Sequence, residues 1–200
     1  MFNTKGQETK KPGLNKSFEA GVVYAHIYDG WIRTAKTGKK ALELILEGPA
    51  LKDFEGWPVD RNNPEGTKYT GQTAKVMGTT YTDQYDQNSI SRNEIMYKLT
   101  MIAEAAGVRK ELDNISVDTL EQWATEVINL VKGKNLYFFC RGTEEEYNGK
   151  TIVKLSLPKY KFVSDDENKL EKFDKTNQYH YRPLATQKVS SFEAADDFNI

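Results

Sequence analysis

The hydrophobic period changes twice along this chain, and that change restricts the folds open to it. Five segments alternate apolar and polar side chains, which is the pattern of a β-strand with one buried face. They lie at about residues 22–28, 41–47, 73–82, 135–142 and 151–157. Between the third and the fourth segment, apolar residues recur every three or four positions instead, which predicts helices.

The predicted helical insert covers about residues 91–132 and carries its own boundary signals. Ser91 and Glu94 have the spacing of a capping box, in which the two side chains accept hydrogen bonds from each other's backbone N–H. Gly107 and Gly133 follow the ends of two predicted helices, where glycine is favoured.

Three strands, a helical segment and two further strands make a mainly β chain of the α+β class. This order is that of the OB-fold, a five-stranded Greek-key barrel, with the helical segment between strands 3 and 4. We therefore expect one OB-fold domain over residues 17–163. Polar composition predicts a flexible N-terminal arm over 1–16 and an acidic, disordered C-terminal tail over 164–200.

The available side chains argue against several kinds of site. One cysteine, Cys140, and two histidines, His26 and His180, cannot build the usual zinc site, and one cysteine cannot form an internal disulfide. There is no Gly-rich phosphate loop ending in Lys-Ser or Lys-Thr. We expect no catalysis, no metal and no cofactor. Lacking a signal peptide and a membrane span, the chain is expected to be cytoplasmic, with no membrane partner.

The net charge of −1 hides a local pattern of charge. Residues 1–40 carry eight cations against three acids, and residues 132–162 carry seven against three. Residues 104–127 carry six acids against two cations. Local sign matters more than the total for binding a polyanion, so the two basic segments are compatible with a nucleic-acid ligand.

Single-stranded nucleic acid needs cations for its phosphates and flat apolar surfaces for its bases. The candidate stacking residues are Tyr24, Tyr28, Trp31, Tyr81, Tyr137 and Phe139. The candidate phosphate contacts are Arg33, Lys36, Lys39, Lys40, Lys75, Arg141 and Lys154. The first predicted hairpin supplies both kinds of residue, and its loop is one of the two binding loops of an OB-fold. The other loop carries Tyr147 and Lys150.

The aromatic candidates also have structural alternatives. Tyr24 and Tyr28 can pair across strands, as aromatic residues do in sheets, and Trp31 can cap the barrel. The helices can cover one of two faces, that of Tyr81 with Lys75 or that of Tyr137 and Phe139 with Arg141.

The C-terminus has a pattern of its own. Asp196 and Asp197 precede Phe198 and Ile200 at the end of a polar segment. Acids followed by apolar side chains form a short docking motif, in which the charge steers and the ring fills a pocket. The alternative is a tail that only aids solubility.

The chain resembles the single-stranded-DNA-binding proteins of bacteriophages. Three stretches carry the resemblance: residues 21–44, residues 133–139 continuing to 147–150, and the acidic end at Asp196-Asp197-Phe198. The resemblance implies a protein of the host cytoplasm that coats exposed strands, without sequence preference, in DNA replication, recombination or repair. It also implies that the tail contacts replication or recombination proteins.

Two other function classes stay open. One is an OB-fold module for protein interaction or assembly, such as a virion component. The other is an accessory domain of a nucleic-acid enzyme. RNA is an alternative ligand, and a homo-oligomer is an open alternative to a monomer.

Overall fold

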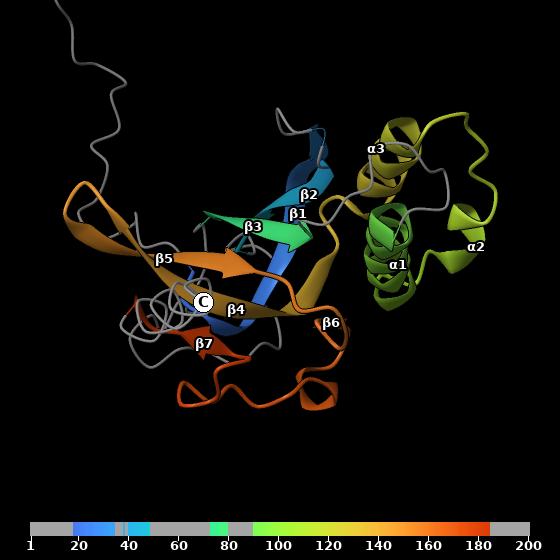
Figure 1. Ribbon diagram of the computed structural model, residues 1–200. Helices are drawn as coiled ribbons and strands as arrows, with labels where there is room; N and C mark the ends of the chain where they lie inside the picture. The colour runs from blue at the N-terminus through green and yellow to red at the C-terminus, as the bar shows by residue number, and fades with distance from the viewer. Residues whose placement is uncertain (1–17, 35–37, 39, 49–72, 80–89, 185–200) are drawn as a thin grey trace, which may run out of the picture.

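A computed structural model describes residues 18–34, 38, 40–48, 73–79 and 90–184 (Figure 1). The strands are β1 (Gly21–Thr34), β2 (Lys40–Glu47), β3 (Thr73–Thr79), β4 (Asn135–Tyr147), β5 (Lys150–Ser156), β6 (Val163–Ser164) and β7 (Tyr181–Arg182). The helices α1 (Ile90–Ala105), α2 (Arg109–Leu112) and α3 (Leu120–Val131) all lie between β3 and β4. The predicted α+β class is confirmed.

The strands pair in a circuit. β1 pairs with β2 and β2 with β3, all antiparallel, and β3 pairs with β5 in parallel. β5 then pairs antiparallel with β4, and β4 with β1. β1 serves both neighbours because residues 21–26 face β4 and residues 26–34 face β2. This mixed sheet is barrel-like and consistent with an OB-fold.

The inner faces of the strands are those that the alternation predicts. Val23, Ala25 and Ile27 of β1 are buried, and so are the three leucines of β2, Leu42, Leu44 and Leu46. Phe138 and Cys140 of β4 complete this layer. Full burial of a side chain such as leucine contributes about 1.5–3 kcal/mol, so these positions provide much of the driving force for folding.

Helices α1 and α3 pack against each other and close one end of the sheet (Figure 1). Ile95, Leu99 and Ile102 of α1 are fully buried, as the helical spacing predicts. Gly30 permits α3 to approach β1. A Cβ atom there would lie 2.6 Å from Cδ2 of Leu44 and 3.0 Å from Cδ1 of Ile128.

Lys98 of α1 is buried at the end of the barrel-like sheet, with 3% of its surface exposed. Its ammonium donates hydrogen bonds to the carbonyl of Gly78 at the end of β3 and, at 3.0 Å, to that of Leu157 just after β5. Burial lowers the pKa of Lys98 from 10.5 to about 8. Lys98 therefore joins α1 to the ends of two strands through a desolvated charge.

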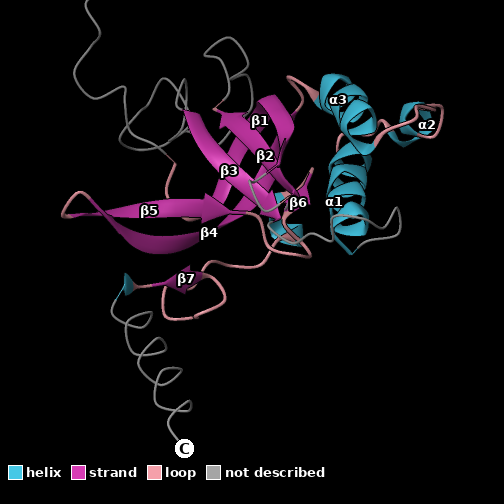
Figure 2. Cartoon of the chain, turned by 45° about the horizontal axis from the view of Figure 1, so that its top comes forward, coloured by secondary structure: helices cyan, strands magenta, loops and turns pink. Residues whose placement is uncertain are grey.

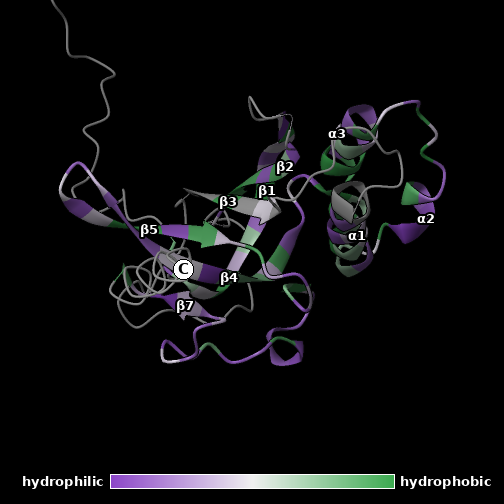
Figure 3. Ribbon diagram, viewed as in Figure 1, coloured by the Kyte–Doolittle hydropathy of each residue, from purple (hydrophilic) through white to green (hydrophobic). Residues whose placement is uncertain are grey.

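The β4–β5 hairpin extends beyond the barrel as an arm (Figure 1), and Figure 3 shows that its tip is largely hydrophilic. The predicted turn at its tip is confirmed, since Asn148 and Gly149 have φ angles of 50° and 71°. Val153, which the alternation places on the inner face, is 45% exposed because the hairpin has left the barrel at that point.

The prediction of a disordered tail from residue 164 is wrong for residues 164–184. This segment forms the second residue of β6, a 3-10 turn over Glu167–Lys169 and β7, and both short strands pair with β4. Leu170 and Tyr181 of this segment are buried, and Tyr181 is paired with Gly142 of β4. The predicted arm at 1–16 and the tail residues Asp196, Asp197, Phe198 and Ile200 lie outside the described residues.

Candidate nucleic-acid interface

The outer face of β1 is interrupted at Tyr28. The pairing of β1 with β2 shifts register between Ile27 and Asp29, which leaves Tyr28 in a β-bulge. After the bulge, Ile32 is paired with the buried Leu42 and Trp31 with Glu43. Trp31 and Arg33 therefore lie on the outer face, where simple alternation from Tyr24 would not have placed them.

Tyr28 and Trp31 are the exposed aromatic residues of this face, at 51% and 37% of their surface. Nζ of Lys132 lies 5.5 Å from the centre of the Tyr28 ring, within the range of a cation–π contact. Lys132 follows α3 directly and was not among the phosphate candidates. The basic character of residues 132–162 was the sequence signal that could have found it.

Tyr24 and Tyr137 form a cross-strand pair between β1 and β4. Their ring centres are 4.5 Å apart with the planes at 51°, and both residues are only partly exposed. Burial raises the pKa of the Tyr137 hydroxyl, and the carboxylates of Glu167 and Asp166 raise it further. Tyr24 therefore pairs with another ring across the two strands, which is the structural alternative to stacking on a base. The acids beside the pair disfavour an approaching phosphate.

Phe139 does not belong to an exposed stacking surface. It is 2% exposed, because the C-terminal segment covers it. The His180 ring lies edge-on at 4.9 Å from its centre, and the Phe173 ring lies at 6.2 Å. The alternation correctly assigned Phe139 to the outer face of β4, but residues more than thirty positions away bury that face.

Three of the predicted phosphate contacts make ion pairs within the chain. Nε of Arg33 lies 2.7 Å from Oε1 of Glu43, whose side chain is only 6% exposed. Lys40 pairs with Glu121 of α3, and Lys154 pairs with Glu145 across the hairpin arm. The pairs of Lys40 and Lys154 are exposed on both sides and contribute at most about 1 kcal/mol, so a phosphate can compete for these two cations. Arg33 is held more firmly, because losing it would leave the buried Glu43 carboxylate without its partner.

The structure describes only some of the remaining candidate residues. Arg141 is partly exposed on β4, and its charge contributes to the lowered pKa of Lys98. Lys75 is paired with Ile45 in the register of β3 with β2. Lys36, Lys39 and Tyr81 lie outside the described residues.

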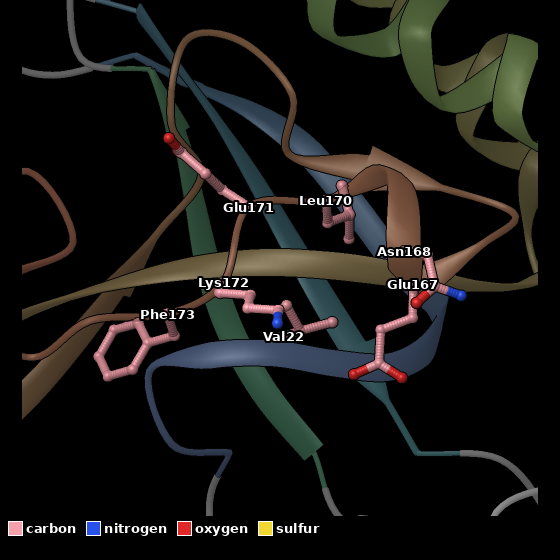
Figure 4. Close-up of a pocket in the computed structure, with 7 residues that line it drawn as sticks. All are labelled: Val22, Glu167, Asn168, Leu170, Glu171, Lys172 and Phe173. Atoms are coloured by element: carbon pink, nitrogen blue, oxygen red, sulfur yellow. The ribbon is translucent and has the colours of Figure 1, made fainter.

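A cavity of about 370 Å³ opens between β1 and the C-terminal segment (Figure 4). Figure 4 shows the Lys172 side chain running beside Val22, while the Glu171 side chain extends away from it, and the carboxylates of Glu167 and Glu171 both belong to the lining. With two carboxylates against one ammonium, the lining does not suit a phosphate. We therefore assign no part of the interface to this cavity.

Two kinds of site are absent from the described part of the chain. No group of three or more His, Cys, Asp or Glu side chains is arranged to hold a metal ion there. Among the same residues, no helix is both long enough and apolar enough to cross a membrane.

Comparisons with known proteins add little to this geometry. No protein-family profile matches the sequence, and no curated protein matches it. One solved structure, described as yeast RPA bound to ssDNA, is similar with 8% sequence identity and a TM-score of 0.27. The similarity covers 98% of this chain and 94% of that one. A likeness at this TM-score carries no argument about the present chain.

Proposed function

We propose that this chain is an OB-fold protein that binds single-stranded DNA without sequence preference and has no catalytic activity of its own. The observation that carries the proposal is the outer face of β1. There Tyr28 and Trp31 are exposed, and Lys132 and Arg33 adjoin them. Exposed rings next to cations match the two needs of a single strand, since bases stack and phosphates pair with positive charge.

The hairpin arm extends this interface in the proposal. Tyr147 at its tip is 63% exposed, and Lys150 follows the turn. This arm is the connection between the fourth and fifth strands, which is a binding loop in OB-folds. In the proposal, the strand stacks on Tyr28 and Trp31 and then contacts the arm. Stacking and phosphate contacts do not depend on the identity of the base, so such binding tolerates any sequence.

The biological setting remains part of the proposal and rests on the resemblance in sequence. In that setting the protein coats strands exposed in replication, recombination or repair. The residues after 184 would recruit the enzymes of those processes.

The test is the fluorescence anisotropy of a labelled thirty-nucleotide oligo-dT across a salt series, with a duplex of equal length as competitor. We expect tight binding that the duplex does not displace. The logarithm of affinity should fall by roughly 0.7 per phosphate contact for each tenfold rise in salt. Absence of binding at low salt would refute the proposal. Magnesium-dependent turnover of the DNA would instead favour the enzyme-domain alternative.

One observation favours a second candidate, a protein-interaction module. A cleft of about 260 Å³ in the helical insert is lined by Met96, Ile115, Val117, Leu120 and Trp123 among others. Val117 is 41% exposed, and residues 104–127 are acidic, so this surface repels DNA. Binding to a protein that persists in high salt, together with no binding to oligo-dT, would select this candidate.

A further inference from the structure

A second exposed aromatic pair lies apart from Tyr28 and Trp31. Tyr97 on α1 and Tyr160 between β5 and β6 meet with ring centres 5.9 Å apart and planes at 76°. Tyr97 is 42% exposed and Tyr160 is 57% exposed. An edge-to-face contact covers at most one face of one ring, so part of the flat surface of each ring stays accessible.

One cation, Lys159, contacts this pair. Nζ of Lys159 lies 5.3 Å from the centre of the Tyr160 ring and 3.4 Å from Oε1 of Glu94. The pKa of Lys159 is raised by its interaction with the Tyr160 hydroxyl and then with Glu94, so the ammonium stays charged at neutral pH. Lys161, also exposed, lies two residues further, and its φ of 51° marks a tight turn of the backbone.

The Tyr97–Tyr160 pair lies close to the point where β3 and β5 end. Lys98, next to Tyr97 in α1, donates to the carbonyls of Gly78 and Leu157. Those carbonyls end the parallel contact of β3 with β5, and Tyr160 follows Leu157 by three residues. The aromatic pair therefore lies at the end of the β3–β5 contact, on the side of the barrel where α1 packs (Figure 2).

We propose that Tyr97 and Tyr160 form a second stacking platform for single-stranded DNA, with Lys159 as its phosphate contact. This inference rests on the proposed function, because the strand held at Tyr28 and Trp31 is the one that reaches the second platform. Lys159 shares its charge with Glu94, but its side chain is 54% exposed against 14% for Glu94, so a phosphate reaches the ammonium from the solvent side. A strand long enough to occupy both platforms binds more tightly than a strand that fills one.

The experiment compares oligo-dT of eight and of thirty nucleotides by anisotropy for wild type, Tyr97→Ala and Tyr160→Ala. Stacking of one base is worth about 1–3 kcal/mol, so each variant should lose about 5- to 150-fold in affinity for the long strand. Affinity for the short strand should change less. Tyr160→Phe keeps the ring and should retain most of the affinity. Tyr179→Ala is the matched control, because Tyr179 is 66% exposed and lies on the C-terminal segment instead.

A photo-crosslink reports the contact directly. A thirty-nucleotide strand carrying 5-iododeoxyuridine should crosslink to the peptide that contains Tyr160 in wild type and far less in Tyr160→Ala, whereas Tyr160→Phe, which keeps a stacking ring, should still crosslink. Thermal unfolding followed by circular dichroism verifies that the variants fold.

The outcomes separate the inference from the proposed function. If wild type binds the long strand and both alanine variants bind it as Tyr179→Ala does, the second platform is refuted and the first survives. If wild type binds neither strand, the proposed function fails and the second platform fails with it.

Discussion

The Tyr181 hydroxyl donates a 2.7 Å hydrogen bond to Oε1 of Glu144, 37 positions earlier in the chain. Oε2 of the same carboxylate accepts from the backbone N–H of Leu184 at 3.0 Å. These contacts attach the end of the described C-terminal segment to the base of the hairpin arm. They explain why a polar stretch that resembles a disordered tail is ordered up to that point.

Removing the hydroxyl should loosen this attachment. In Tyr181→Phe, the amides of residues 174–184 should exchange with deuterium roughly tenfold faster, because one hydrogen bond to a charged group is lost. Amides of β1 and β2 should be unaffected. Tyr179→Phe is the control, since Tyr179 is exposed. Unchanged exchange at 174–184 would show that the segment is held by its apolar contacts alone.

The hydrogen bonds of Glu144 to Tyr181 and Leu184 should weaken as the pH falls. The Leu184 N–H and then the Tyr181 hydroxyl lower the pKa of Glu144 below its ordinary value. A lowered folded-state pKa stabilises the fold above the unfolded value, and this contribution is lost as pH falls through the folded pKa. The exchange difference between wild type and Tyr181→Phe should therefore be present at pH 7 and should shrink as Glu144 is protonated in acid.

Gly142 is the position of β4 that admits the Tyr181 ring. A Cβ atom there would lie 2.6 Å from Cδ2 of Tyr181 and 2.9 Å from Cβ of Ala20. Gly142→Ala should destabilise the protein by about 1–3 kcal/mol in urea unfolding, because overpacking displaces the ring. Gly149→Ala is a poor control, since Gly149 has a positive φ. Thr143→Ala, at the next position of β4, is the better one.

Lys98 should make stability rise with pH in the alkaline range. Its pKa is about 8 in the folded protein and 10.5 in the reference state. Between these values the unfolded chain holds a proton that the folded chain has released, so the free energy of unfolding increases with pH. Two pH units correspond to about 2–3 kcal/mol. Urea unfolding at pH 7–10 should show this rise in wild type and in the exposed-site control Lys110→Met. If the same rise in stability with pH persisted in Lys98→Met, it would not come from Lys98.

Glu43 should restrain Arg33. Glu43→Gln removes the carboxylate that lies 2.7 Å from Nε of Arg33 and leaves the guanidinium more available to a phosphate. Affinity for oligo-dT at low salt should rise several-fold, and the salt slope should steepen by roughly 0.7, the value for one more phosphate contact. Glu104→Gln removes one of the two carboxylates paired with Arg109 on the helical insert, the other being that of Asp113, and should change neither quantity.

Tyr28 and Trp31 should matter more than Tyr24 for binding. Tyr28→Ala and Trp31→Ala should each weaken binding of the thirty-nucleotide strand by about 5- to 150-fold, as expected for one lost stacking surface. Tyr24→Ala should act mainly on stability, because that ring is packed against Tyr137. If Tyr24→Ala weakened binding more than Tyr28→Ala and Trp31→Ala did, the DNA would instead bind near the Tyr24–Tyr137 pair between β1 and β4.

Several features could be predicted from local pattern because they depend on local physics. The alternation around Val23 and Leu44 identified the inward faces, and the helical spacing of Ile95, Leu99 and Ile102 identified the buried side of α1. Turn chemistry located the hairpin at Asn148 and Gly149. Each of these signals lies within a few residues, where backbone geometry sets the period.

The candidate site was predictable only in part, because exposure depends on distant segments. A two-residue period assigns Phe139 to the outer face of β4, but only the fold brings Phe173 and His180 over it. The bulge at Tyr28 breaks the period within β1 and needs the register with β2 to be seen.

By itself, the sequence determined the order of the five longer strands and of the helices between them, the inward faces and the local charge of each segment. The tertiary structure decided which outward rings remain exposed and which cations are already paired, as Arg33 is with Glu43 and Lys40 is with Glu121. The reason is that periodicity arises from neighbouring residues, whereas burial and ion pairing join residues that only folding brings together.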